Sequence, residues 1–164
     1  MRLFLDTNLV RYIGTHQGYV FETEESDDLA AEQPLMREQI DALWAIFKAD
    51  ERAHFEFVIS PGVLGEIMDS PVGEAEGNIV SLLLEHSRDL AEQEGWQYDE
   101  VAVRRIEQGL KEFTKSQCKD RRLLAEAIFF ECDVFLTNDL RLVKKAGGFA
   151  VRPLDFWESI RRGL

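Results

Sequence analysis

Residues 2–6 read Arg2-Leu3-Phe4-Leu5-Asp6, a short apolar run that stops at a carboxylate. An apolar run of this length without alternation is typical of a strand buried on both faces of a parallel sheet. Three more short runs of this kind follow, at residues 55–59, 134–137 and 149–151. Segments with apolar residues at helical spacing separate them, so the pattern predicts an α/β protein. We expect a three-layer α/β/α sandwich with a small central parallel sheet.

Helical spacing and Pro or Gly punctuation define the segments between the predicted strands. The predicted helices cover residues 34–49, a short stretch between Gly62 and Pro71, 79–94, 103–113, 120–128, 139–146 and 155–162. Residues 1–164 match the length of one domain. Within it we expect a helical extension at about residues 72–118. Residues 15–33 hold six acids and few apolar residues, which predicts a solvated acidic loop or insertion.

The composition is that of a soluble globular protein, with 45% apolar and 30% charged residues. No apolar run approaches the ~20 residues that span a bilayer, and the N-terminal run meets Asp6 too early for a signal peptide. We therefore expect a cytoplasmic protein without a membrane partner. Two cysteines and three scattered histidines favour neither a disulfide framework nor a zinc site.

The net charge of −12 by itself disfavours a nucleic-acid partner. The charge is unevenly distributed along the chain, however. Residues 1–103 hold 6 Lys and Arg against 22 Asp and Glu, whereas residues 104–164 hold 13 against 9. A polyanion could therefore approach the second half of the chain, although an ordinary solvated surface explains the same asymmetry.

Four acids fall at or near the carboxyl ends of the predicted strands, where open parallel sheets place their sites. Asp6 follows the first strand, Glu66 lies in the helix after the second, and Asp139 lies two residues past the third. Asp120 begins the helix that leads to the third strand and heads its apolar face. Each acid alone is equally compatible with a helix N-cap, a turn or a favourable position in a helix dipole.

No lysine or arginine in the sequence is placed to pair with all four acids. Like charges that gather at one point repel and raise one another's pKa. A hard divalent cation, Mg²⁺ or Mn²⁺, would relieve this repulsion through oxygen ligands. Such an ion lowers the pKa of a bound water and stabilises a phosphate oxygen. The set therefore predicts metal-dependent hydrolysis of a phosphodiester bond.

Two polar residues lie beside these acids. Asn8 follows Asp6 by two residues, and Thr137 precedes Asp139 by two. Each could orient a carboxylate or a metal-bound water. Turn chemistry for Asn8 and a strand-end hydroxyl for Thr137 are the alternatives.

Four motifs resemble those of PIN-domain nucleases and occur in the order of that family. They are LFLDTN at residues 3–8, ISPGVLGE at 59–66, DRRLLAEA at 120–127 and CDVFLTND at 132–139. The resemblance implies a metal-dependent ribonuclease in which Asp6, Glu66, Asp120 and Asp139 form an acidic quartet. Asn8 and Thr137 would support it.

The resemblance also implies a mechanism and partners. Asp6, Asp120 and Asp139 would ligate the metal, and Glu66 would bind it or position the attacking water. Cleavage of the RNA substrate would leave a 5′-phosphate and a 3′-hydroxyl. Basic residues near the rim could hold phosphates, or simply be solvated; they are Lys119, Arg121, Arg122, Arg141, Lys144 and Lys145. Many small single-domain members are toxins of the VapC type, which form homodimers and are inhibited by an antitoxin protein. Segments 15–33 and 72–118 depart from that compact toxin pattern.

Two other functions remain open on the sequence alone. A phosphatase of the haloacid-dehalogenase kind also begins with a strand and an Asp, but it needs a second acid where this chain has Asn8. The other is a catalytically weak or inactive PIN-like module that binds RNA or protein.

Overall fold

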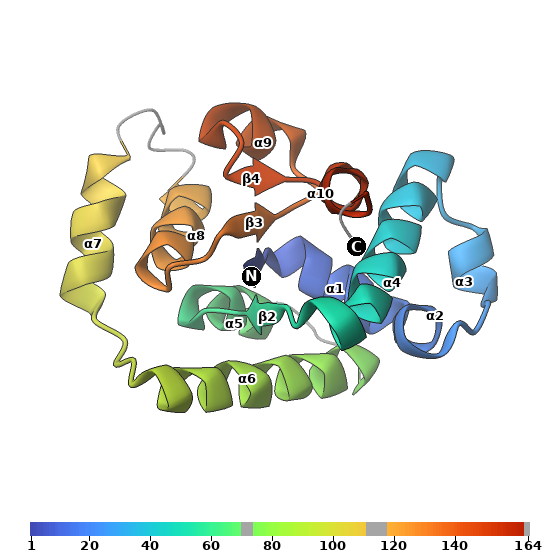
Figure 1. The fold of residues 1–164 in the computed structure, drawn as a ribbon, viewed down its shortest axis with the longest axis horizontal. Helices are drawn as coiled ribbons and strands as arrows, with labels where there is room; N and C mark the ends of the chain where they lie inside the picture. The colour runs from blue at the N-terminus through green and yellow to red at the C-terminus, as the bar shows by residue number, and fades with distance from the viewer. Residues whose placement is uncertain (70–73, 111–117, 163–164) are drawn as a thin grey trace.

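The computed structural model describes residues 1–69, 74–110 and 118–162 (Figure 1). Within these residues the chain is mixed α/β, with one four-stranded sheet in the order β2-β1-β3-β4. All three strand pairings are parallel. The strands are β1 (Arg2–Leu5), β2 (Glu56–Val58), β3 (Val134–Leu136) and β4 (Ala150–Val151). The prediction of an α/β protein with a small parallel sheet is therefore confirmed.

The opening strand β1 lies at the centre of the core. Leu3, Phe4 and Leu5 are fully buried. Phe4 pairs in register with Phe135 of β3, and their rings stack at 4.9 Å between centroids. Strand β2 is shorter than predicted because the amide of Ile59 donates to Ser87 Oγ (3.1 Å) instead of extending the ladder.

Helices fill the intervals between the strands. Those before β3 are α1 (Thr7–Thr15), α2 (Gln17–Glu22), α3 (Asp27–Ala30), α4 (Pro34–Ala53), α5 (Pro61–Met68), α6 (Glu74–Glu94), α7 (Glu100–Gly109) and α8 (Cys118–Phe129). Helix α9 (Leu140–Ala146) joins β3 to β4, and α10 (Pro153–Ile160) closes the described fold. Helix α10 begins two residues earlier than predicted because Pro153 suits its first turn. The expected helix ends at Pro71 and Phe113 lie outside the described residues.

The prediction of a loop over residues 15–33 is wrong. Helices α2 and α3 occupy most of this segment, and Val20 and Leu29 are buried under them. Arg37 of α4 holds the segment in place, since its guanidinium pairs with Glu25 at 2.8 Å and lies 4.8 Å from the centroid of the Tyr19 ring. One of the acids that suggest a solvated loop, Glu25, is therefore an ion-pair partner of a neighbouring helix.

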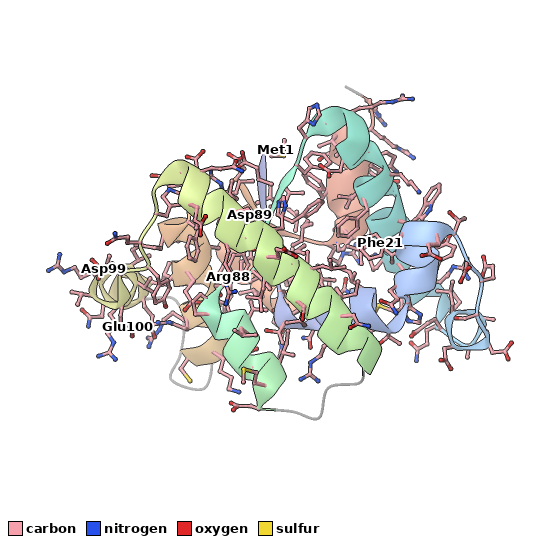
Figure 2. All side chains as sticks on the ribbon, turned by 90° about the horizontal axis from the view of Figure 1, so that it is seen from below. Met1, Phe21, Arg88, Asp89, Asp99 and Glu100 are labelled. Carbon is pink, nitrogen blue, oxygen red and sulfur yellow. The ribbon has the colours of Figure 1, made fainter. Side chains whose placement is uncertain are left out.

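Different helices lie on the different sides of the sheet. Figure 1 shows α4 on one side of the sheet, with α2 and α3 beyond it, and α8 and α7 on the other side. Seen from below, α6 runs diagonally across the front of the molecule (Figure 2), and it packs against α1 and β2. Helices α6 and α7 confirm the helical character expected for the described part of residues 72–118. None of the described helices combines the length and apolar character needed to cross a bilayer.

Candidate active site

Because the sheet is parallel, every strand ends at the same edge, which we call the carboxyl edge. Asp6 leaves β1 at this edge and Thr137 leaves β3 beside it. Asp6 is 7% exposed, and its Oδ2 accepts a hydrogen bond from Thr137 Oγ1 at 2.6 Å. The same hydroxyl oxygen accepts from the amide of Asp139 at 3.0 Å. The Thr137 hydroxyl therefore joins two of the predicted site residues.

Asp139 precedes α9 and caps its N-terminus. Its Oδ1 accepts from the amides of Arg141 (2.7 Å) and Leu142 (3.4 Å). The Arg141 guanidinium also reaches its Oδ2 at 3.2 Å, but the Arg141 side chain is 84% exposed. Burial raises the pKa of Asp139, and the bonds from Arg141 and the two amides outweigh that effect, so the pKa lies below its usual value. An ion pair so open to solvent is weak and can be exchanged.

Glu66 lies in α5. Ser60 is the N-cap of this helix, and its side chain accepts a hydrogen bond from the amide of Val63. Its Oε2 accepts from Thr7 Oγ1 at 2.7 Å, and Thr7 is the residue directly after Asp6. Helix α5 thus brings Glu66 to the start of α1. The interaction ties the second predicted motif to the first.

Asp120 lies in the first turn of α8 and is half-buried. Burial raises its pKa, and repulsion from Asp139 and Glu66 raises it further. The positive charges of Arg141 and Lys145 oppose the shift. Asp120 is therefore within electrostatic reach of two other predicted carboxylates.

Asp6 has the most perturbed carboxyl of the quartet. Burial is the largest cause and raises its pKa to about 6, against a usual value of 3.8. Hydrogen bonds from Thr137 and from the Thr7 amide oppose the shift, while the charges of Glu66 and Asp120 add to it. Asp6 is therefore repelled by Glu66 and Asp120, and Asp120 is repelled in turn by Asp139 and Glu66. Only Asp139 of the four has an Arg or Lys partner among the ion pairs of the described residues.

The donor set suits a hard divalent cation in type and in charge. Mutual repulsion at Asp6 and Asp120 is what such an ion would relieve. In the described residues, however, no three His, Cys, Asp or Glu side chains are already arranged around one point where a metal could bind. Thr137, Thr7 and Arg141 each hold one acid in its present orientation. Each carboxylate retains free lone pairs that a cation could use.

The predicted supporting and basic residues divide into two groups. Thr137 contacts the quartet, whereas Asn8 is exposed on α1 and has no hydrogen bond to a quartet acid among the described contacts. Arg121 and Arg122 face α7, where they pair with Glu107 and Glu100. The charges of Arg141 and Lys145 do act on the quartet. Beside Glu66, a hollow of about 360 Å³ is bordered by Lys119 and Arg122.

Sequence reasoning missed Glu126, a carboxylate that is 1% exposed in α8. It accepts from four donors: Ser60 Oγ, the amide of Gly62 (3.2 Å), Tyr98 Oη (2.7 Å) and Arg122 Nε (2.9 Å). These bonds clamp the start of α5, which carries Glu66, against α8, which carries Asp120. The only signal in the sequence is the spacing of Arg122 and Glu126, four residues apart, and that spacing is common on exposed helices.

In comparisons with known proteins, no family model, no curated protein and no solved structure matches this chain.

Proposed function

We propose that the chain is a divalent-metal-dependent endoribonuclease with a three-layer PIN-like fold. One observation carries the proposal: at the carboxyl edge Thr137 bridges the buried Asp6 and the amide of Asp139, and the charges of Glu66 and Asp120 add to burial in raising the pKa of Asp6 to about 6. Such an arrangement is unfavourable without a cation, and carboxylates with perturbed pKa values gather at functional sites.

The residues at the carboxyl edge would have different roles in the reaction. When bound, Mg²⁺ or Mn²⁺ would supply an activated water and neutralise charge on the phosphate. Asp6, Asp120 and Asp139 would hold the ion, and Glu66 would hold it or orient the water. Thr137 keeps Asp6 facing the edge through its 2.6 Å bond. The exposed Arg141 is free to exchange Asp139 for a phosphate oxygen of the RNA.

The test is cleavage of a single-stranded RNA in Mn²⁺ by the wild type, Asp6→Asn and Asp89→Asn. Asp89 lies exposed on α6 (Figure 2), a helix that carries none of the four acids, and serves as the matched control. We expect Asp6→Asn to fall to the rate seen with chelator, with its circular dichroism unchanged. Wild-type products should carry 5′-phosphates. Cleavage by Asp6→Asn at the wild-type rate would refute the assignment.

The resemblance to VapC-type toxins extends the proposal to partners. We propose a homodimer that is inhibited by a cognate antitoxin protein in the cytoplasm. A small DNA-binding protein encoded immediately upstream would support this, and co-expression of the two should suppress the ribonuclease activity.

A catalytically inactive module that binds RNA or protein is the second candidate. The observation that favours it is the present arrangement of the quartet, in which Arg141 covers Asp139 and no three ligands converge. Titration with Mn²⁺ separates the two, because an inactive module shows neither metal binding nor cleavage.

A further inference from the structure

A groove between α4 and α10 combines aromatic and basic side chains. Its volume is about 560 Å³, and the side chains that line it are Trp44, Ala45, Lys48, Ala49, Arg52, Trp157 and Arg161. Three of these residues are cations and none is an acid, although the whole chain carries a net charge of −12. The groove is therefore a local positive site on an acidic protein.

The cations of the groove are available to a ligand. Lys48 donates to the carbonyl of Phe21 at 3.2 Å, which leaves its charge unneutralised. Arg161 pairs with Glu158 only at 3.5 Å, and both side chains are about half exposed. Arg52 has no ion pair in the described part of the chain and is exposed. Exposed pairs of this kind exchange readily for a phosphate.

The two tryptophan side chains of the groove are held in place by contacts with the rest of the protein. Trp44 donates from Nε1 to Thr23 Oγ1 at 3.1 Å, and both Trp44 and Trp157 are half-buried. Indole faces beside cations are the equipment with which proteins bind single-stranded nucleic acids, since bases stack on the rings while phosphates meet the charges. Past the two indoles lies a second hollow bordered by Glu38 and Asp41, where a phosphate would be repelled.

We propose that the groove between α4 and α10 is a second binding site for single-stranded RNA, distinct from the acidic quartet. The inference rests on the proposed function for its choice of RNA. Near the start of α4, Met36 contacts Asn138, the neighbour of Asp139. Lys48 lies twelve residues further along α4, a distance of ~18 Å at 1.5 Å per residue. About five stacked nucleotides would span that distance. The groove would therefore bind a part of the RNA strand that lies several nucleotides from the cleavage site.

The test measures binding without catalysis. A fluorescently labelled 15-nucleotide RNA is titrated with full-length Asp6→Asn protein in chelator, and anisotropy is followed over a range of salt concentrations. The triple variant Lys48→Gln/Arg52→Gln/Arg161→Gln should bind at least 10-fold more weakly. Its slope of log K against log salt should be smaller by about 2, because three phosphate contacts are lost. The control removes three exposed cations elsewhere (Arg88→Gln/Arg104→Gln/Arg105→Gln) and should change binding less than 2-fold.

Tryptophan fluorescence reports on the groove directly. Two of the three tryptophans line it, while Trp96 packs under the Arg2 guanidinium at 4.1 Å. Unlabelled RNA should quench fluorescence in wild type and in Trp96→Phe alike, and the quenching should disappear in the groove triple variant. Quenching that disappears in Trp96→Phe instead would place the RNA elsewhere and overturn the inference.

The outcomes separate this inference from the proposed function. Groove-dependent binding without any cleavage in Mn²⁺ would support the groove and refute the nuclease. Cleavage with unchanged binding by the groove triple variant would refute the groove alone. Sedimentation in which wild type is a dimer and the triple variant a monomer, with RNA binding unchanged, would assign the groove to a second copy of the chain and overturn the proposal.

Discussion

The carboxyl of Asp6 is held in a state that opposes folding at neutral pH. Burial and its acidic neighbours raise its pKa to about 6 in the fold, above the 3.8 of the free side chain. A carboxyl of this kind binds its proton more tightly in the native than in the unfolded state. Ionising Asp6 in the fold therefore lowers the free energy of unfolding. This loss of stability is small below pH 3.8, grows as the pH rises toward about 6, and reaches its full size above that pH.

Asp6→Asn should therefore stabilise the metal-free protein at pH 8. The gain is at most about 3 kcal/mol, from a shift of roughly two pKa units at 1.36 kcal/mol each. It should largely vanish near pH 3.5, where Asp6 is mostly protonated in both states. Urea unfolding in chelator at the two pH values measures it, with Asp89→Asn as the neutral control. A variant less stable than wild type at pH 8 would contradict the repulsion.

At the scale of elements, α5 and α8 can pack this closely because residue 62 is a glycine and has no Cβ. A Cβ there would collide with Oε2 of Glu126 and lie 3.0 Å from Leu123 Cδ2. A Cβ at Gly65, one turn further along α5, would meet nothing within 4 Å beyond its chain neighbours and the backbone of its own helix. The two glycines of one helix therefore have opposite roles.

Gly62→Ala should destabilise the protein by about 1–3 kcal/mol through overpacking against a clamped carboxylate. Gly65→Ala should instead stabilise it by about 0.5–1 kcal/mol, because alanine is the better helix former. Paired urea titrations of the two variants measure the difference. Equal effects from both substitutions would show that Glu126 does not clamp the start of α5.

The elements that sequence could predict are those whose signal is local. The strand at residues 2–5, the apolar face of α4 and the termination of β3 before Asp139 follow from periodicity and punctuation. Because parallel strands share one edge, the approach of Asp6 to Thr137 at the end of β3 also follows. Helix α1 was not among the predicted helices, although Leu9, Val10 and Ile13 are buried in it.

Long-range partners decided the features that sequence could not predict. Residues 15–33 form helices because Arg37 pairs with this segment and because Val20 and Leu29 pack into the core. The acidic composition of the segment gives no sign of either contact. Glu126 is buried because Ser60, Tyr98 and Arg122 surround it. A glutamate on a helix is ordinarily exposed, so its burial could be found only from the fold.

For the whole molecule, a bound cation should reverse the electrostatic cost of the quartet. We expect saturating Mn²⁺ to raise the melting temperature, with a stabilisation of about 2.7 kcal/mol at one hundred times its dissociation constant. Differential scanning fluorimetry in Mn²⁺ and in chelator measures this for wild type and Asp6→Asn. The variant should gain markedly less, since it lacks a ligand. Equal shifts in both proteins would place the metal elsewhere.

The pairing of β1 with β3 also sets when the site can exist during synthesis. Thr137 and Asp6 are 131 positions apart, yet one hydrogen bond joins them. A nascent chain emerging from the ribosome holds Asp6 from the start but cannot gather the quartet until α9 has left the exit tunnel. Whatever chemistry these acids perform, a ribosome-bound chain that has not yet been extended to Asp139 cannot perform it.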